Sequence, residues 1–287
     1  MDFKLENNYL SVIVKKQGVE LVSASSKTTN FEYIWQGDPQ FWTGQAPVLF
    51  PAVGEFKDEI CFFEGVQFSI PKHGFVRHNP NFDLLEYKDN SVLLELRHSE
   101  ETLKMYPFKF SFRIQYSLEK NKLIVHHEVW NLDQKTMYFC LGGHPAFNCP
   151  DGIENYRIKF DETESVKTTL LSEGGLITDT QEDVLVEQNE IQLTEHIFDR
   201  DALIFTDLQS NHASLENNKG VPLVSMDYNG FPFLGIWSKP KAPYVCIEPW
   251  IGIADHEHTT GEFKDKLGVQ SLPAGNLFEA DYSIKFH

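Results

Sequence analysis

The chain has 287 residues and a formal net charge of −17, which results from 25 Lys+Arg against 42 Asp+Glu. This acidic balance argues against nucleic acid or an anionic membrane surface as a partner. No apolar run approaches the ~18 residues of a membrane-spanning helix, and no apolar stretch follows a basic start, so the sequence predicts a cytoplasmic protein.

The sequence predicts one domain over residues 1–287. A chain of this length can bury one large core, and no linker, repeat or low-complexity segment divides it. The cysteines show no Cys-x-x-Cys spacing, which is typical of buried free thiols in a reducing compartment. They are Cys61, Cys140, Cys149 and Cys246.

Three successive segments, 91–98, 108–116 and 122–130, alternate apolar and polar residues and are separated by short polar turns. Alternation with a period of two is typical of strands that have one buried and one solvated face. The three segments therefore predict an antiparallel meander.

Helix is scarce in the predicted structure. The best short candidate covers 99–106, because Ser99 can cap its N-terminus and Pro107 ends it. The end of the chain returns to strand, since apolar and polar residues alternate over 278–286.

One segment near the middle of the chain predicts a buried strand that leads into a functional site. Residues 137–141 are apolar on both faces, which is typical of a central strand. Gly142 and Gly143 then permit positive φ and close backbone approach, and Pro145 fixes its own φ and withholds a donor. His144 is held between these constraints, and the alternative is a histidine that is satisfied within the core.

Further polar residues stand at positions suited to a site. His73 precedes Gly74, whose permissive backbone can present the imidazole, and Arg77 follows on an extended segment. Asp201 comes just before an apolar strand. The alternatives are a surface-loop histidine and a carboxylate that caps a turn.

Glu248 shares a strand face with Tyr244 and Cys246. Partial desolvation there predicts a pKa raised toward the range useful to a general base. The 23 Phe, 10 Tyr and 5 Trp suit a large twisted β-sandwich, in which nearly all of them are expected to be core residues. Phe41-Trp42 and Trp250 stand beside polar residues and are the candidate platforms for a sugar ring.

Three motifs, in this order and spacing, resemble the aldose 1-epimerase (galactose mutarotase-like) family. They are His-Gly-Phe-Val-Arg at 73–77, Gly-Gly-His-Pro-Ala-Phe-Asn at 142–148 and Ile-Glu-Pro-Trp at 247–250. The resemblance extends over nearly the whole chain and is greatest to the bacterial branch typified by the LacX protein of lactose operons. It implies an all-β fold, namely a β-supersandwich of large twisted antiparallel sheets with very little helix.

The resemblance also implies an activity, which is interconversion of the α and β anomers of a free aldose such as glucose or galactose. The chemistry is general acid/base ring opening without a metal or another cofactor. The family's general base falls on Glu248 and its general acid on His144. Its substrate-binding positions fall on His73, Asp201, Arg77 and Trp250.

One departure bears on the substrate. Many relatives in this branch read Phe-Pro-x-Val-Gly-Arg, whereas this chain has Phe-Pro-Ala-Val-Gly-Glu, which ends at Glu55. The loss of a cation predicts a preference for neutral aldoses over their 6-phosphates. The alternative functions are a hexose-6-phosphate 1-epimerase and a non-catalytic carbohydrate-binding or sensing protein, and we expect a monomer or weak homodimer.

Two further expectations concern geometry and metals. We expect the site residues to converge on one open groove, in which Glu248 and His144 meet water. A metal site at Asp255-His-Glu-His258 or His126-His127 is the alternative, but the sequence offers no third ligand at convincing spacing, and a solvated acidic loop is favoured.

Overall fold

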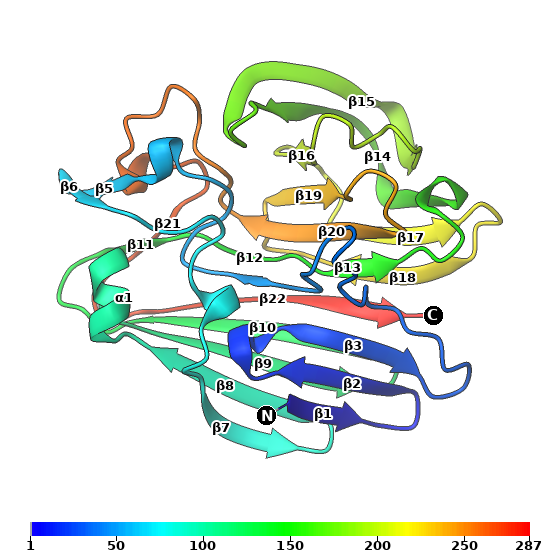
Figure 1. Cartoon of the computed structure of the whole chain (residues 1–287), viewed down its shortest axis with the longest axis horizontal. Coiled ribbons are helices and arrows are strands. Elements are labelled where there is room, and N and C mark those ends of the chain that lie inside the picture. The colour runs from blue at the N-terminus through cyan, green and yellow to red at the C-terminus, as the bar shows by residue number, and fades with distance from the viewer. Residues whose placement is uncertain (1) are drawn as a thin grey trace.

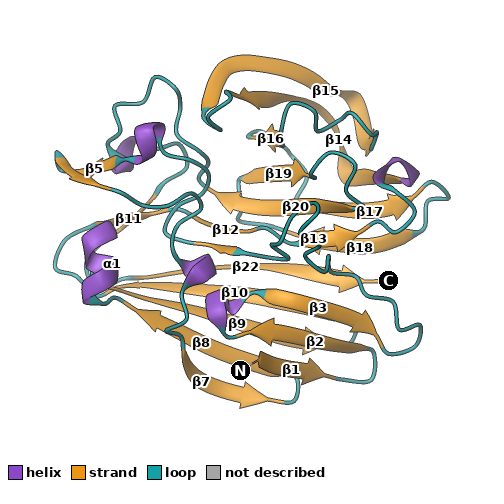
Figure 2. Cartoon of the chain, in the orientation of Figure 1, coloured by secondary structure: helices purple, strands orange, loops and turns teal. Residues whose placement is uncertain are grey.

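Nearly all regular structure in the protein is β-strand, as Figure 2 shows. The computed structural model describes residues 2–287, and the single α-helix among them has six residues. The largest sheet has nine strands, and every neighbouring pair is antiparallel. The predicted all-β fold is therefore confirmed. In spatial order the nine strands are β15 (Ile177–Gln192), β14 (Tyr156–Leu171), β17 (His212–Asn217), β18 (Pro222–Asp227), β22 (Leu277–Phe286), β10 (Lys122–Asn131), β9 (Phe110–Glu119), β8 (Ser91–Arg97) and β7 (Asp83–Lys88).

A six-stranded sheet lies across the middle of Figure 1, between β15 at the top and β7 at the bottom. Its strands are β16 (Leu203–Phe205), β19 (Phe233–Trp237), β20 (Tyr244–Ile251), β12 (Leu141–Gly143) and β4 (Val48–Leu49), with β13 (Ala146–Asn148) also paired to β20. Three small sheets complete the fold. They are β1 (Asp2–Glu6), β2 (Leu10–Lys15) and β3 (Leu21–Ser26); β5 (Cys61–Phe63) and β6 (Val66–Phe68); and β11 (Met137–Phe139) and β21 (Gln270–Leu272).

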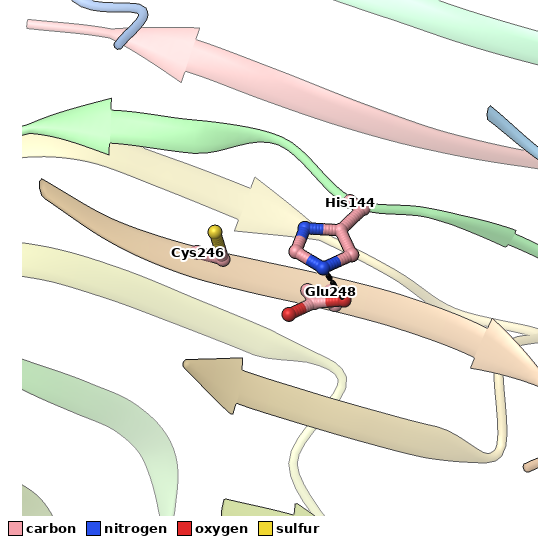
Figure 3. Close-up of side chains that lie close together, drawn as sticks. All are labelled: His144, Cys246 and Glu248. Carbon is pink, nitrogen blue, oxygen red and sulfur yellow. Dashed lines mark ion pairs between the residues drawn. The ribbon is translucent and has the colours of Figure 1, made fainter. Parts of the chain in front are cut away.

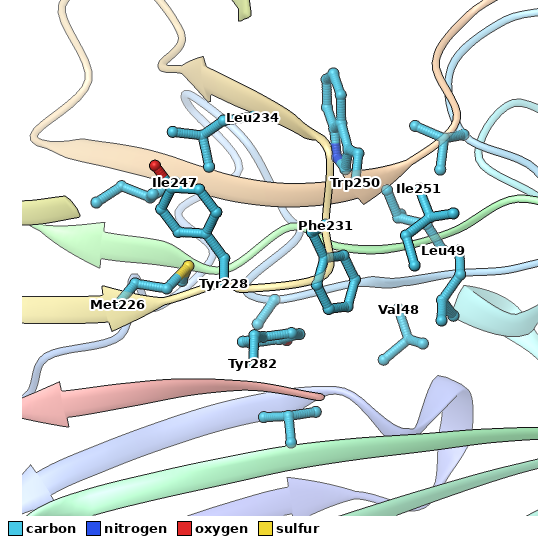
Figure 4. Packing of buried hydrophobic residues seen from close by; sticks show 14 of the residues in the cluster. Val48, Leu49, Met226, Tyr228, Phe231, Leu234, Ile247, Trp250, Ile251 and Tyr282 are labelled. Atoms are coloured by element: carbon cyan, nitrogen blue, oxygen red, sulfur yellow. The ribbon is translucent and has the colours of Figure 1, made fainter. Parts of the chain in front are cut away.

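Part of the hydrophobic core lies between the two large sheets, as the side chains in Figure 4 show. Val48 on β4 and Ile247 on β20 belong to the same buried cluster as Met226 on β18 and Tyr282 on β22. Burial of an apolar side chain of this size contributes roughly 1.5–3 kcal/mol relative to exposure. The packing therefore holds β20, which carries Glu248, in a fixed position.

The predicted meander and closing strand are confirmed. β8, β9 and β10 pair antiparallel in sequence order, and β22 pairs with β10. The alternating apolar residues of β9, from Phe110 to Tyr116, are all buried, whereas Arg113 and Gln115 on the other face are partly exposed. The period-two pattern thus identified the buried face correctly.

The predicted helix is also confirmed as α1 (Glu100–Met105). The Ser99 hydroxyl accepts from the Thr102 N–H, and the Thr102 hydroxyl accepts from the Ser99 N–H, so the helix begins with a capping box.

No helix among residues 2–287 is long and apolar enough to cross a membrane. Short 3₁₀ helices are η1 (Gln17–Val19), η2 (Lys57–Glu59), η3 (Val76–His78), η4 (Ile153–Asn155) and η5 (Phe263–Asp265).

The strand predicted over 137–141 is interrupted at Cys140. Its two halves pair in different sheets, β11 with β21 and β12 with β4 and β20. The Cys140 N–H instead donates to the Pro51 carbonyl at 2.7 Å, which explains the break. Gly142 and Gly143 do not adopt positive φ. They serve close approach, because a Cβ would lie 2.7 Å from Trp250 Cδ1 in the first case and 2.5 Å from the Tyr282 hydroxyl in the second.

Candidate active site

The six site residues predicted from the sequence lie around one cavity of about 700 Å³. β16 and β20 of the six-stranded sheet carry residues that line the cavity, and β12 is followed directly by His144. The turn between β14 and β15 forms part of the cavity wall. The predicted convergence therefore holds for every member of the set. They are His73, Arg77, His144, Asp201, Glu248 and Trp250.

His144 and Glu248 are brought together by strand register. β12 pairs with β20 through Gly142↔Trp250, and β13 pairs with β20 through Ala146↔Cys246. The same register, continued across the break between β12 and β13, places His144 directly opposite Glu248. Cross-strand neighbours have side chains within contact distance. The Nε2 atom of His144 lies 3.1 Å from Oε2 of Glu248, and Figure 3 shows the two groups facing each other.

The pair is more deeply buried than predicted. Glu248 is 1% exposed and His144 is 8% exposed, so the expectation of an open groove in which both meet water is wrong. The surrounding core explains this, since every residue of β20 is buried. Both residues nevertheless line the cavity.

Burial shifts both ionisation equilibria toward the neutral forms. It raises the pKa of Glu248 well above its usual value, and the nearby Asp201 carboxylate acts in the same direction. Burial lowers the pKa of His144 to about 3, with a further contribution from the Arg77 guanidinium. The rise predicted for Glu248 therefore has the expected direction and cause, and the pair together tends to hold one proton.

His73 presents a defined hydrogen-bond donor to the cavity. The Gly54 N–H donates to its Nδ1 at 3.1 Å, so the proton of the neutral ring is on Nε2. Burial lowers the pKa of His73 well below its usual value, and the ring of His144 adds to this effect. A neutral His73 can therefore donate one hydrogen bond to a ligand oxygen.

The backbone is strained at two of the predicted residues. His73 has φ 63° and Asp201 has φ 74°, a region that side chains other than glycine rarely adopt. Such strain tends to cluster at functional sites, where the surrounding structure enforces it. Asp201 lies two residues before β16, close to the strand start as predicted, and is exposed. Arg77 lies in η3 rather than on the extended segment that was predicted; it is half-buried, and its Nε atom lacks a hydrogen-bond partner within residues 2–287.

Aromatic side chains form one wall of the cavity. Trp42, a candidate platform from the sequence, lies 4.9 Å from His144 and 5.5 Å from Trp237 between ring centroids. Trp237 was not predicted, because it occurs in a strand where an aromatic residue is ordinarily a core residue. Trp250 lines the same cavity and is 5% exposed.

Sequence patterns also missed the turn between β14 and β15. Leu171, Ser172, Glu173 and Gly175 line the cavity, although the two strands are largely solvated. A backbone bridge between Ile177 and His256 joins the start of β15 to the loop after β20. Short polar turns of this kind occur throughout the sequence, so nothing in the local pattern distinguished this one.

The cavity wall carries four basic and four acidic side chains, and burial favours the neutral form of one of the acidic ones, Glu248. The basic side chains are Lys72, Arg77, Arg200 and Lys239, and the acidic ones are Glu173, Asp199, Asp201 and Glu248. Two of the cations are paired, since Lys72 lies 3.3 Å from Glu55 and Arg200 contacts Glu182. This balance favours a polar ligand without net charge.

In the loop proposed as an alternative metal site, Asp255 is buried and paired with Lys266 at 2.7 Å, whereas the two histidines are partly or fully exposed. His256 lies 3.2 Å and His258 lies 3.8 Å from the Asp179 carboxylate, a partner that the sequence did not reveal. The His258 N–H also donates to Nδ1 of His256. Hydrogen bonds and ion pairs at the protein surface are therefore enough to explain why these histidines lie close together.

Comparison with known proteins agrees with this architecture. Residues 1–263 match the family described as Aldose 1-epimerase. The plasmid-encoded protein LacX of Lactococcus lactis subsp. lactis is 33% identical over 300 residues, which cover 99% of each chain. A galactose mutarotase related enzyme from Lactobacillus acidophilus is 34% identical with a TM-score of 0.93, covering 100% of this chain and 97% of its own. A galactose mutarotase-like protein from Lactobacillus casei is 29% identical with a TM-score of 0.95 and full coverage of both chains. The predicted galactose mutarotase-like fold is thereby confirmed.

Proposed function

The chain belongs to the aldose 1-epimerase family, and we propose that it interconverts the α and β anomers of a free aldose such as glucose or galactose. The observation that carries the proposal is the buried Glu248–His144 pair, 3.1 Å apart at the wall of a cavity with balanced charge. We also infer that residues 1–287 act as one domain, because the similarity to LacX covers 99% of the chain.

The geometry of the pair suits ring opening. The anomeric hydroxyl and the ring oxygen of an aldose are bonded to the same carbon, so they lie close together. A carboxylate and an imidazole 3.1 Å apart can each approach one of these oxygens at a normal hydrogen-bond length of about 2.7–3.0 Å. Glu248 then takes the proton of the anomeric hydroxyl while His144 gives a proton to the ring oxygen, and ring closure on the other face reverses both transfers.

The protonation state follows from burial. Burial favours neutral Glu248 and neutral His144, whereas the proposed first step needs the carboxylate and the imidazolium. Both states hold the same single proton. Hydroxyl groups of a bound sugar that donate to Glu248 offset part of the desolvation and favour the charged state. His73, Asp201, Arg77 and Trp250 are the proposed substrate-binding residues, and Trp42 and Trp237 add an aromatic wall beside His144.

The proposal is tested by polarimetry with freshly dissolved α-glucose and α-galactose. We expect the purified protein to accelerate the decay of optical rotation far above the buffer rate, without added metal or another cofactor. If the decay stays at the buffer rate while calorimetry detects sugar binding, the protein is instead a carbohydrate-binding or sensing protein on the same fold.

A second prediction concerns phosphorylated substrates. Glu55 neutralises Lys72, a cation on the cavity wall, so we expect free aldoses to be preferred over their 6-phosphates. Glu55→Gln frees Lys72 without adding charge, and Glu55→Arg also adds a cation. The ratio of kcat/KM for glucose 6-phosphate over glucose should rise a few-fold in the first variant and roughly tenfold in the second, since the pair is partly solvated. Preference of the wild type for the 6-phosphate would contradict the prediction and favour a hexose-6-phosphate 1-epimerase.

A further inference from the structure

A third side chain completes a group of soft and hard donors beneath the cavity. The Cys246 thiol belongs to β20, two residues before Glu248, and points to the same face of the strand, as Figure 3 shows. Nε2 or Nδ1 of His144, Sγ of Cys246 and a carboxylate oxygen of Glu248 all lie within 4.8 Å of one another. All three residues are at least nine-tenths buried.

The spacing of these atoms is close to that of a tetrahedral zinc site. Zn²⁺ binds sulfur at about 2.3 Å and nitrogen or oxygen at about 2.0–2.2 Å, which places neighbouring ligands roughly 3.3–3.6 Å apart. The Nε2–Oε2 distance is 3.1 Å and all three donor atoms lie within 4.8 Å of one another, so a bound cation would have to draw the more distant donors closer. His144 and Glu248 line the cavity, which gives a cation a route to the group.

The carboxylate is available to a cation. Oε2 of Glu248 is buried and accepts no hydrogen bond of good geometry within residues 2–287, although Nε2 of His144 lies 3.1 Å from it. A buried acceptor without a partner is costly and gains by binding a cation or a donor. Lys72 and Arg77 line the same cavity and oppose a cation, while Asp201 attracts one.

We propose that His144, Cys246 and Glu248 form a binding site for a thiophilic divalent cation such as Zn²⁺ or Cd²⁺, which excludes the sugar. A thiolate, an imidazole and a carboxylate select these ions over Mg²⁺ and Ca²⁺, which prefer oxygen ligands. The proposal that a cation binds depends only on the geometry of the three donor side chains. Its consequence, reversible inhibition, rests on the proposed function, because the cation occupies both the base and the acid.

Two other groups of side chains in the described part of the chain contain residue types that bind metals, but they differ from the first group in exposure and in composition. They are His126, Glu128 and Glu279, and Asp179, Glu257 and His258. Both lie at partly or fully exposed positions, and neither contains a thiol. The second group is suited as a control, because His258→Ala removes an exposed ligand from a group that contains no cysteine.

The experiment titrates the chelator-treated protein with Cd²⁺ and follows the near-ultraviolet thiolate-to-metal charge-transfer band, with Zn²⁺ affinity measured by calorimetry. We expect one equivalent to saturate the band. Cys246→Ser should abolish the band and weaken Zn²⁺ binding by roughly 10²–10³-fold, one ligand's share of a zinc site. Cys61→Ser, which changes another buried free thiol, and His258→Ala should keep the band.

Glu248→Gln gives a second measurement that does not depend on the folding of the cysteine variant. It should keep a weakened band and lower Zn²⁺ affinity, because one charged ligand is lost while the thiol remains. Absence of the band in the wild type, or its persistence in Cys246→Ser, overturns the site. If the band forms as expected but mutarotation is undetectable without metal, the site stands and the proposed function fails.

Discussion

Glu248→Gln is expected to lower kcat for mutarotation by roughly 10²–10⁴ while KM changes little, since a positioned general base contributes about that factor. The glutamine side chain has nearly the same shape and keeps an oxygen toward the cavity, but it cannot accept the anomeric proton. A loss confined to kcat identifies an interaction made in the transition state, whereas a rise in KM alone identifies ground-state binding. Stopped-flow or polarimetric progress curves over a range of glucose concentrations separate the two.

Stability should not fall in the same variant, although the reason differs from the one suggested by the sequence. An exposed groove residue would be indifferent to the change, but Glu248 is almost fully buried. Because its pKa in the folded protein is raised above the unfolded value, its contribution to stability is fully present below the unfolded pKa of about 4.3 and is lost as pH rises toward the folded pKa. At pH 7 the wild type bears this cost and the glutamine variant does not. The unfolding midpoint of Glu248→Gln at pH 7 should equal or exceed that of the wild type, and the difference should shrink near pH 4.

Glu164 provides a matched control, because it is also a buried carboxylate on a strand. It differs in being satisfied, with the backbone N–H groups of Gln209 and Ser210 and the Ser210 hydroxyl donating to it. Glu164→Gln keeps one acceptor oxygen for the donors at Oε1, but it removes the charge and places an NH2 group where Oε2 accepts from the Gln209 N–H, which should cost about 1–3 kcal/mol of stability. Its kcat should be unchanged, since Glu164 does not line the cavity. If Glu248→Gln keeps the wild-type kcat, Glu248 is not the base and the assignment fails at its central residue.

The strands could be predicted from the sequence because the alternation of apolar and polar residues in each strand depends on which of its own faces is buried. The alternation over β9 and β22 follows from one buried and one solvated face, and that pattern needs no knowledge of distant residues. The interruption at Cys140 was missed for the opposite reason. It depends on a hydrogen bond to Pro51, about ninety residues earlier in the chain, which local pattern cannot reveal.

The residues of the site could be named from motifs, but their geometry could not. Contact between His144 and Glu248 depends on the pairing of β12 and β13 with β20, and register between distant strands is not encoded in either segment alone. Their deep burial likewise follows from the sheets that close around β20. Trp237 and the turn after β14 escaped prediction because their sequences resemble an ordinary core strand and an ordinary loop.

His144→Asn is expected to lower kcat by roughly 10²–10⁴, because the ring oxygen then lacks a positioned proton donor. Asparagine still offers a hydrogen bond but cannot exchange a proton at neutral pH, so sugar affinity should change much less. The matched control is His127→Asn, another buried histidine, whose Nδ1 contacts the Ala280 carbonyl and which does not line the cavity. That variant should lose stability and keep kcat.

The double variant Glu248→Gln/His144→Asn tests whether the two groups act as one unit. Proton removal from the anomeric hydroxyl and proton delivery to the ring oxygen belong to the same ring opening, and the two groups lie 3.1 Å apart. Removal of either partner therefore already stalls the step, and the second substitution has little left to remove. We expect the double variant to resemble the slower single variant, with a kcat far above the product of the two separate losses. Losses that multiply would mean that the residues contribute independently, and one of them would then act on binding or positioning rather than in the shared proton transfer.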